Sequence, residues 1–306
     1  MFELLGKTNF DFIGKRYLAF SFSGLFVVLG LLSAISIGTG KANLGIDFAG
    51  GTAVQLKFDR PVKIEDARQI LERNDLKDAE LQEFSNGNKL LIRIKNQSAI
   101  QEKISEKIVS VFSKEYPDNR FVVDSTEQIG PTIGQKLQRD ATLAVGISIL
   151  GIIIYIALRF EFRFGVAAAV ATFHDVLAVL GIFFILHREI NLLVVTALLT
   201  VAGYSLTDTV VVFDRIRENL KKRSREGLDQ VINSGINQVL SRTIVVSLTV
   251  FLVLLALFFF GGEVIHDFSF ALLLGVVIGT YSSIFVASPI LVIWKGSNRK
   301  LLRPRA

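Results

Sequence analysis

Six long apolar runs, separated by polar segments, set the pattern of this chain of 306 residues. Each run comes close to the roughly 20 residues that a helix needs to cross a bilayer. The runs lie at 17–38, 141–158, 165–186, 191–213, 243–260 and 268–294. They predict an α-helical integral membrane protein with six transmembrane helices. No clear small-residue cleavage motif follows the first run, so we interpret it as a retained helix and not as a signal peptide.

The segment between the first and second runs has the pattern of a small α+β domain. Segments with strand and helix patterns follow one another in the order β-α-β-β-α-β, which is the ferredoxin-like plan. Strands are expected at 52–58, 79–84, 89–95 and 121–128, helices at 64–73 and 101–112, and a hairpin turn at Asn86-Gly87. Residues 39–140 hold 16 Lys and Arg against 16 Asp and Glu. We therefore expect a charge-balanced, periplasmic ferredoxin-like domain at 39–138.

The composition is typical of a membrane protein and excludes several kinds of chemical site. Hydrophobic residues make up 51% of the chain and the mean hydropathy is +0.49. The chain has no Cys, which excludes disulfides and thiolate metal sites, and its three His residues argue against a dedicated metal centre. We find no phosphate-binding loop and no dinucleotide-binding fingerprint. We therefore expect no enzymatic activity and an energy source other than a bound nucleotide.

The net charge of +6 is distributed as a membrane topology signal. If the N-terminus is cytoplasmic, six alternating spans place the Lys and Arg of the short connections mostly on the cytoplasmic side, as the positive-inside rule requires. The cytoplasmic parts would then be the N-terminus (1–16), a basic loop (214–241) and the tail (295–306). We expect these basic residues to set the topology and to contact anionic membrane lipid, and we expect no nucleic-acid partner.

Four ionisable residues interrupt the apolar pattern. His174 and Asp175 lie near the middle of the third span. Asp208 lies about 8 Å inside the cytoplasmic end of the fourth, at about 1.5 Å per residue, and Arg242 precedes the fifth. A charged carboxylate deep in a bilayer costs at least about 2.5 kcal/mol, so Asp208 must stay protonated or meet a cation. An Asp208–Arg242 pair that opens on protonation is a candidate proton-gated element. All four residues can alternatively serve as structural polar contacts between helices.

Helix faces and glycines add further candidates. One polar stripe follows helical spacing along the fourth span, and we expect it to face other helices or water: Thr196, Thr200, Gly203, Tyr204, Thr207 and Asp208. In the sixth span, Gly275 and Gly279 form a G-x-x-x-G motif, for which we expect a packing role. Asp47, Gly50 and Gly51 are expected to shape the turn that leaves the first span, because glycine permits unusual backbone angles.

Six stretches together resemble the SecD/SecF family of protein-export membrane proteins, within the resistance–nodulation–division superfamily of proton-coupled transporters. They occur in the order of that family and at its spans, and they cover essentially the whole chain. They read LGIDFAGG (44–51), IGPTIGQKL (129–137), FHDV (173–176), GYSLTDTVVVFDRIRE (203–218), INQVLSRT (236–243) and GTYSSIFVASP (279–289). The chain departs from the family pattern at a few positions, such as Phe213 and Val239, and none of these departures replaces an ionisable residue.

The resemblance implies a function. A member of this family works with SecD in the bacterial inner membrane. It assists export of unfolded preproteins through the SecYEG channel after the ATPase SecA has driven their entry. The proton-motive force powers movement of the periplasmic domains, with sodium as an alternative to protons and with no bound cofactor. The key aspartate and arginine of the family map onto Asp208 and Arg242.

Two other functions stay open at this point. One is a proton-coupled exporter of small molecules or lipids from the same superfamily. Such exporters usually carry twelve spans and two large outside domains on one chain, and this chain has half of each. The other is a passive assembly scaffold, whose polar residues would only hold the helices together.

Overall fold

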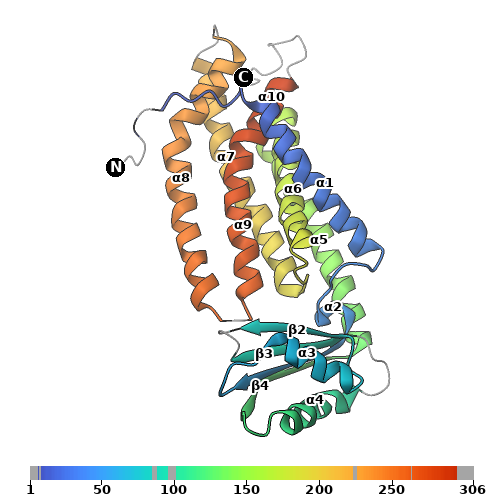
Figure 1. The fold of residues 1–306 in the computed structure, drawn as a ribbon. Coiled ribbons are helices and arrows are strands. Elements are labelled where there is room, and N and C mark those ends of the chain that lie inside the picture. The colour runs from blue at the N-terminus through green and yellow to red at the C-terminus, as the bar shows by residue number, and fades with distance from the viewer. Residues whose placement is uncertain are drawn as a thin grey trace. The chain divides into compact units, whose positions relative to one another are not determined.

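The computed structural model describes residues 6, 8–84, 88–95, 101–222, 226–262 and 264–294 (Figure 1). The chain divides into two compact units, which we call the bundle and the α+β domain. The bundle comprises Met1–Asn43, Val145–Arg188 and Leu193–Ala306, and the α+β domain comprises Leu44–Ala144 and Glu189–Leu192. The short segment Glu189–Leu192 therefore belongs to the α+β domain, although it connects two helices of the bundle.

Six helical segments of the described chain are long and apolar enough to cross a membrane, which confirms the predicted fold class. They are α1 (Arg16–Gly38), α5 (Pro131–Arg159), α6 (Phe162–Ile185), α7 (Leu192–Lys222), α8 (Leu228–Phe260) and the segment His266–Ile293. In the last segment, a single π-helical turn (Ser283–Ala287) joins α9 (His266–Ser282) to α10 (Ser288–Ile293). The chain has the architecture of a multi-pass membrane protein.

Helices α7 and α8 both extend beyond their apolar segments. Most of residues 214–241, which we expected to form a basic loop, is therefore helical. The reason is an apolar face that persists through the charged sequence. Ile216 and Ile236 are fully buried, and a Cβ on Gly235 would lie 2.9 Å from Ile216 Cγ1. The two helices thus stay packed against each other past the apolar runs. The expected tail at 295–306 lies outside the described residues.

Helices α6, α7 and the α9–α10 segment form the interior of the bundle. Between 50% and 56% of their apolar windows is buried, against 6% to 22% for α1, α5 and α8. Helix α1 packs closely on α6, since a Cβ on Gly181 would lie 2.9 Å from the backbone nitrogen of Gly30. Two interior helices, α6 and α7, carry the carboxylates that the apolar pattern singled out.

The G-x-x-x-G motif lies where α9 approaches α7. A Cβ added to Gly275 would lie 2.0 Å from Val201 Cγ2, and a Cβ added to Gly279 would lie 3.2 Å from Ser205 Cβ. Side chains at these two positions would push the helices apart. The motif therefore permits the close approach for which small residues are used in membrane helices.

The π-helical turn precedes a proline. Pro289 has no backbone N–H, and inside a regular α-helix its ring would clash with the carbonyl four residues earlier. The wider π turn accommodates the proline, and the Ser288 hydroxyl donates a hydrogen bond to the Ser283 carbonyl at 2.9 Å. Such single π turns are frequent at functional sites, and this one directly follows Ser282.

The α+β domain is a four-stranded antiparallel sheet with two helices on one face (Figure 1). The sheet consists of β1 (Gly51–Phe58), β2 (Ala79–Phe84), β3 (Lys89–Lys95) and β4 (Phe121–Ile129), in the spatial order β2-β3-β1-β4. The helices are α3 (Ile64–Arg73) and α4 (Gln101–Glu115). This is the predicted β-α-β-β-α-β order. The expected hairpin turn at Asn86-Gly87 lies outside the described residues.

One face of the sheet builds the core of the domain. Val54, Leu56 and Phe58 alternate along β1 and are almost completely buried, together with Leu71 of α3 and Phe112 of α4. The period of two directs these side chains to the helices. The opposite face carries charged and polar side chains. Helix α5 already begins at Pro131, so the last residues of the expected domain (39–138) belong to this helix.

The chain enters the sheet through a turn at Gly50 and Gly51. A short helix, α2 (Ile46–Ala49), precedes it and was not predicted. The two glycines have φ angles of 72° and 145°, and a Cβ on Gly51 would lie 2.3 Å from the Ile94 carbonyl oxygen. Asp47, which we expected to shape this turn, has a different contact: its Oδ2 accepts a hydrogen bond from the backbone N–H of Leu192 at 2.9 Å. Asp47 therefore caps the first turn of α7.

Candidate functional site

Asp175 on α6 is completely buried and is held by one histidine and two serine hydroxyls. Its Oδ1 lies 2.8 Å from His174 Nδ1. Its Oδ2 accepts hydrogen bonds from Ser282 Oγ on α9, at 2.7 Å, and from Ser205 Oγ on α7. Among the described residues, the other ring nitrogen of His174 has no hydrogen-bond partner although it is buried. Three helices thus meet at this carboxylate, beside a ring nitrogen that can bind a proton.

Asp208 on α7 is 6% exposed and is held by hydroxyls from α8 and α9. Ser247 Oγ and Thr280 Oγ1 each lie 3.4 Å from Asp208 Oδ2. Thr280 Oγ1 also donates to Ser247 Oγ at 2.7 Å, and the Tyr204 hydroxyl lies 3.4 Å from the same serine oxygen. Contacts of 3.4 Å are at the weak end for hydroxyl donors. The second carboxylate is therefore held more loosely than the first.

Two helices contribute to both sites. We call His174, Asp175, Ser205 and Ser282 the Asp175 cluster, and Tyr204, Asp208, Ser247 and Thr280 the Asp208 cluster. Helix α7 supplies Ser205 to one and Asp208 to the other, three residues apart on one face. Helix α9 supplies Ser282 to one and Thr280 to the other. A change of protonation at either carboxylate therefore alters bonds made by the same two helices.

Each cluster places a carboxylate in a buried setting, next to neutral hydroxyl donors. An ionised carboxylate that leaves water loses several kcal/mol of solvation, and neutral hydroxyl donors restore only part of it. Each carboxylate, if it is ionised, is therefore only partly compensated by its hydroxyl partners, and protonation removes this cost. In the part of the chain that the structure describes, no three His, Asp or Glu side chains are grouped so that they could hold a metal ion.

Arg242 is not paired with Asp208 in this structure. Its side chain on α8 is exposed, and it forms no ion pair with any carboxylate of the described residues. It lies five residues before Ser247, which belongs to the Asp208 cluster, on the same helix. The expected contact between Asp208 and Arg242 stays a prediction.

The structure divides the polar stripe that we expected along α7. Asp208 is buried and Tyr204 is partly buried, but the other four members are exposed on this chain: Thr196, Thr200, Gly203 and Thr207. The Thr200 and Thr207 hydroxyls donate to backbone carbonyls four residues earlier on the same helix, at 2.9 and 3.1 Å. Local bonds therefore satisfy these hydroxyls without a partner helix. The buried polar face of α7 is formed by Ser205, Asp208 and Thr209 instead.

Sequence reasoning missed Ser205, Ser247, Thr280 and Ser282 as carboxylate partners. Their common signal is a small hydroxyl side chain within a mostly apolar helix. Ser205 also lies three residues from Asp208, on the same face. The donors on α8 and α9 lie 39 and 72 residues from Asp208, so only the folded structure identifies them.

A second unpredicted contact ties the N-terminal segment to α8. Asn233 Oδ1 accepts a hydrogen bond from the Phe12 N–H at 3.0 Å. Asn237 bonds both backbone groups of Phe10, each at 2.9 Å. The two asparagines are four residues apart and share one face of α8. The segment before α1 is thus fastened to the start of α8.

Models of one protein family match most of the chain. The C-terminal model of the protein export membrane proteins SecD and SecF matches residues 108–297. The SecD/SecF GG motif matches residues 35–62, which include Gly50 and Gly51. The two matches cover parts of both the bundle and the α+β domain.

Individual relatives agree with the family models. The protein translocase subunit SecF of Thermodesulfovibrio yellowstonii is 51% identical over 305 residues, which are 99% of this chain and 100% of the relative. That of Calditerrivibrio nitroreducens is 41% identical over 296 residues, 96% of each chain. The crystal structure of SecDF, a translocon-associated membrane protein from Thermus thermophilus, matches 94% of this chain with a TM-score of 0.81 and 36% identity. This chain spans 39% of that SecDF chain. The chain belongs to the SecF family of protein translocase subunits.

Proposed function

We propose that this chain uses a proton gradient to assist the export of unfolded preproteins through the SecYEG channel of the bacterial inner membrane, after the ATPase SecA has driven their entry. The observation that carries the proposal is the pair of buried carboxylates, Asp175 and Asp208, on helices that share their bonding partners. Ionisable residues within membrane helices are candidates for proton or ion pathways by default. One proton that crosses 100 mV releases about 2.3 kcal/mol. That energy shifts a two-state equilibrium by roughly 50-fold.

The proposed partner is SecD. The SecDF relative carries a chain of which this one covers 39%, which leaves room there for a second subunit-like part. The polar stripe exposed on α7 and the exposed Arg242 form polar surfaces that lipid disfavours. Helices of a partner subunit would cover them, and a partner carboxylate would neutralise the arginine. We place the N- and C-termini in the cytoplasm and the α+β domain outside it, since that orientation satisfies the positive-inside rule.

The experiment compares Asp208→Asn with wild type in inverted membrane vesicles that contain the assembled complex and the channel. Preprotein import is measured with and without an imposed proton-motive force. We expect Asp208→Asn to remove the gradient-dependent component and to leave the ATP-driven component. The matched control is Asp214→Asn on the same helix, because Asp214 forms a surface ion pair with Arg159.

One result would contradict the proposal. If Asp208→Asn vesicles with normal amounts of complex keep the full response to the gradient, Asp208 does not couple protons to export. A sodium gradient imposed in place of the proton gradient identifies the coupling ion. We propose no bound cofactor and no enzymatic activity, so the gradient is the only energy source that the proposal assigns to this subunit.

A further inference from the structure

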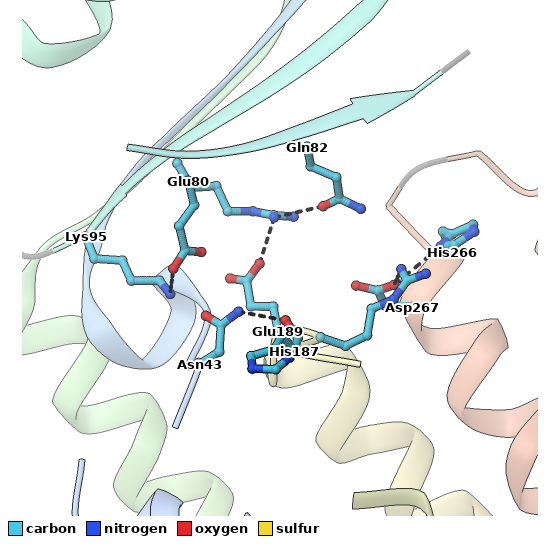
Figure 2. A network of polar contacts seen from close by, with 10 residues as sticks. Asn43, Glu80, Gln82, Lys95, His187, Glu189, His266 and Asp267 are labelled. Atoms are coloured by element: carbon cyan, nitrogen blue, oxygen red, sulfur yellow. Dashed lines mark hydrogen bonds and ion pairs between the residues drawn. The ribbon is translucent and has the colours of Figure 1, made fainter. Parts of the chain in front are cut away.

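Of the four places where the chain crosses between the bundle and the α+β domain, two are linked to each other. One crossing follows Asn43 and the other follows Arg188. Within the bundle, Asn43 Nδ2 donates a hydrogen bond to the His187 carbonyl at 3.1 Å (Figure 2). Within the α+β domain, the Gly45 N–H donates to the Ile190 carbonyl at 3.0 Å. The two crossings are therefore tied together on each side of the boundary.

Arg188 and Glu189 are neighbours in sequence and form ion pairs in different units. Arg188 Nη1 lies 2.7 Å from Asp267 Oδ1 at the start of α9, and its guanidinium lies over the Phe270 ring. Glu189 Oε2 lies 2.9 Å from Nη1 of Arg93 on β3 (Figure 2). The peptide that joins the two residues is thus anchored to the bundle on one side and to the sheet on the other.

The Arg93–Glu189 pair is well shielded. The two side chains are 18% and 6% exposed, whereas those of Lys95 and Glu80, a pair on the same sheet, are 23% and 43% exposed. Arg93 Nη1 also donates to Gln82 Oε1 at 2.9 Å, which fixes the guanidinium on the sheet. Water screens an exposed pair, but separation of a shielded pair leaves two poorly solvated charges. This contact therefore resists separation more than the other one.

The far end of the same segment is also held by the α+β domain. Leu192 is the first residue of α7, and its N–H donates to the Asp47 carboxylate at 2.9 Å. The segment Glu189–Leu192 is thus fixed to the domain at its start, in its middle and at its end. His187, just before it, has a positive φ of 50°, a backbone conformation that residues other than glycine seldom adopt. The α6–α7 connection therefore consists of a sharp bend followed by a firmly attached segment.

We infer that the segment Glu189–Leu192 transmits movement between the two helices of the buried carboxylates and the α+β domain, with Arg93–Glu189 as its principal attachment. Helix α6 carries Asp175 and runs into this segment, and α7 carries Asp208 and begins in it. A shift of either helix moves an end of the segment, and its contacts pass the shift to β3. Arg93 and Glu189 are positioning residues, because they contact neither carboxylate cluster.

This inference rests on the proposed function and is tested in the same vesicles, with the complete complex and channel. The variants are Arg93→Gln, Glu189→Gln and the double exchange Arg93→Glu with Glu189→Arg. We expect each single variant to lose the gradient-dependent component of import and to keep the ATP-driven component. The exchange restores most of the lost component, because it returns opposite charges to the same places. The control Glu80→Gln removes the exposed pair with Lys95 and leaves both components unchanged.

Asp208→Asn separates failure of this inference from failure of the proposed function. If Asp208→Asn loses the gradient response while Arg93→Gln and Glu189→Gln both keep it, the transmitting role is overturned and the proposed function stands. If Asp208→Asn itself keeps the response, the proposed function fails, and the inference fails with it.

A second measurement needs no change at the ion pair, so it does not depend on whether those variants fold. Hydrogen exchange is compared between wild type and Asp208→Asn in the assembled complex. We expect peptides that cover β3 and residues 189–192 to change their protection together, whereas those that cover α3 do not. Unchanged exchange in both peptides would overturn the inference.

Discussion

Thr280 and Ser282 lie two residues apart on α9 and hold different buried carboxylates: Thr280 contacts Asp208, and Ser282 contacts Asp175. At 3.6 residues per turn, positions two apart point about 200° away from each other. Helix α9 therefore lies between the two clusters and bonds to both. This arrangement gives Thr280 a role that a packing residue lacks.

We expect Thr280→Val to weaken the response of import to the proton gradient about fivefold. Valine keeps the volume but removes the hydroxyl that contacts both Asp208 and Ser247, and a net hydrogen bond is worth roughly 1 kcal/mol. The measurement is import as a function of the imposed gradient. Thr280→Ser restores the response. Thr249→Val serves as the control, since that exposed hydroxyl on α8 bonds only to its own helix, at Val246 O. A full response in Thr280→Val would exclude Thr280 from the site.

We expect Gly275→Ala to destabilise the bundle by about 1–3 kcal/mol, the usual range for overpacking. The added methyl would lie 2.0 Å from Val201 Cγ2, so α7 and α9 would have to separate. Thermal unfolding of the complete chain in detergent measures the effect. Gly203→Ala on α7 is the matched control, because no atom lies within 4 Å of the position of its Cβ. Equal melting temperatures for the two variants would show that the motif does not set the helix spacing.

We expect Gly51→Ala to destabilise the α+β domain by about 1–3 kcal/mol, the range for a strained backbone position. Its φ of 145° is costly for a residue with a side chain, and its Cβ would lie 2.3 Å from the Ile94 carbonyl oxygen. Faster hydrogen exchange in β1 and β3 of the full-length protein reports the loss. Gly130→Ala, with open space around its Cβ, leaves exchange unchanged. If exchange in β1 and β3 of Gly51→Ala were as slow as in wild type, the turn at Gly51 would not require glycine.

We expect the N-terminal segment to leave α8 as the pH falls below 3.8. Hydrogen bonds from the Gly14 N–H and from Asn233 hold the pKa of Asp11 below its ordinary value of 3.8. A lowered pKa in the folded state means that the attachment is present above the ordinary value and is lost as the pH falls through the folded value. The chain has no Cys, so a spin label on Asn9→Cys reports the mobility of this segment alone.

The asparagine contact supplies the check on this pH dependence. With Asn233→Ala, we expect the label to be mobile at every pH, because the segment loses its bonds at Phe12 and Asp11 together. If the label stays immobile in acid and in Asn233→Ala, other contacts hold the segment.

The sequence predicted the membrane helices and the order of strands and helices along the α+β domain, because both follow from local rules. A bilayer demands long apolar runs, and a half-buried sheet demands alternation. The expected basic loop at 214–241 is mostly helical instead. The charged residues there conceal a buried helical face, to which Ile216 and Ile236 belong. Hydropathy locates the part of a helix that lies in lipid, but side-chain burial decides where the helix ends.

The site was predictable only in part. Asp175 and Asp208 are visible in the sequence because a carboxylate in an apolar run is conspicuous. Their partners are ordinary serines and threonines on other helices, which no local pattern connects to them. The stripe on α7 divides into buried and exposed positions for a related reason: a threonine hydroxyl can bond to its own helix, as Thr200 does, so polarity alone does not give direction.

The π-helical turn fixes the rotational phase of the last helix. One extra residue in a turn rotates everything after it by about 100° relative to a regular helix. Deleting a single residue from the turn would keep the length of the segment almost unchanged but would turn Leu291 out of the buried face while Thr280 and Ser282 stay in place. The turn thus allows both parts of this segment to face the right neighbours. The hydroxyls before it contact the carboxylates, and the apolar side chains after it pack in the core, which one regular helix could not provide together.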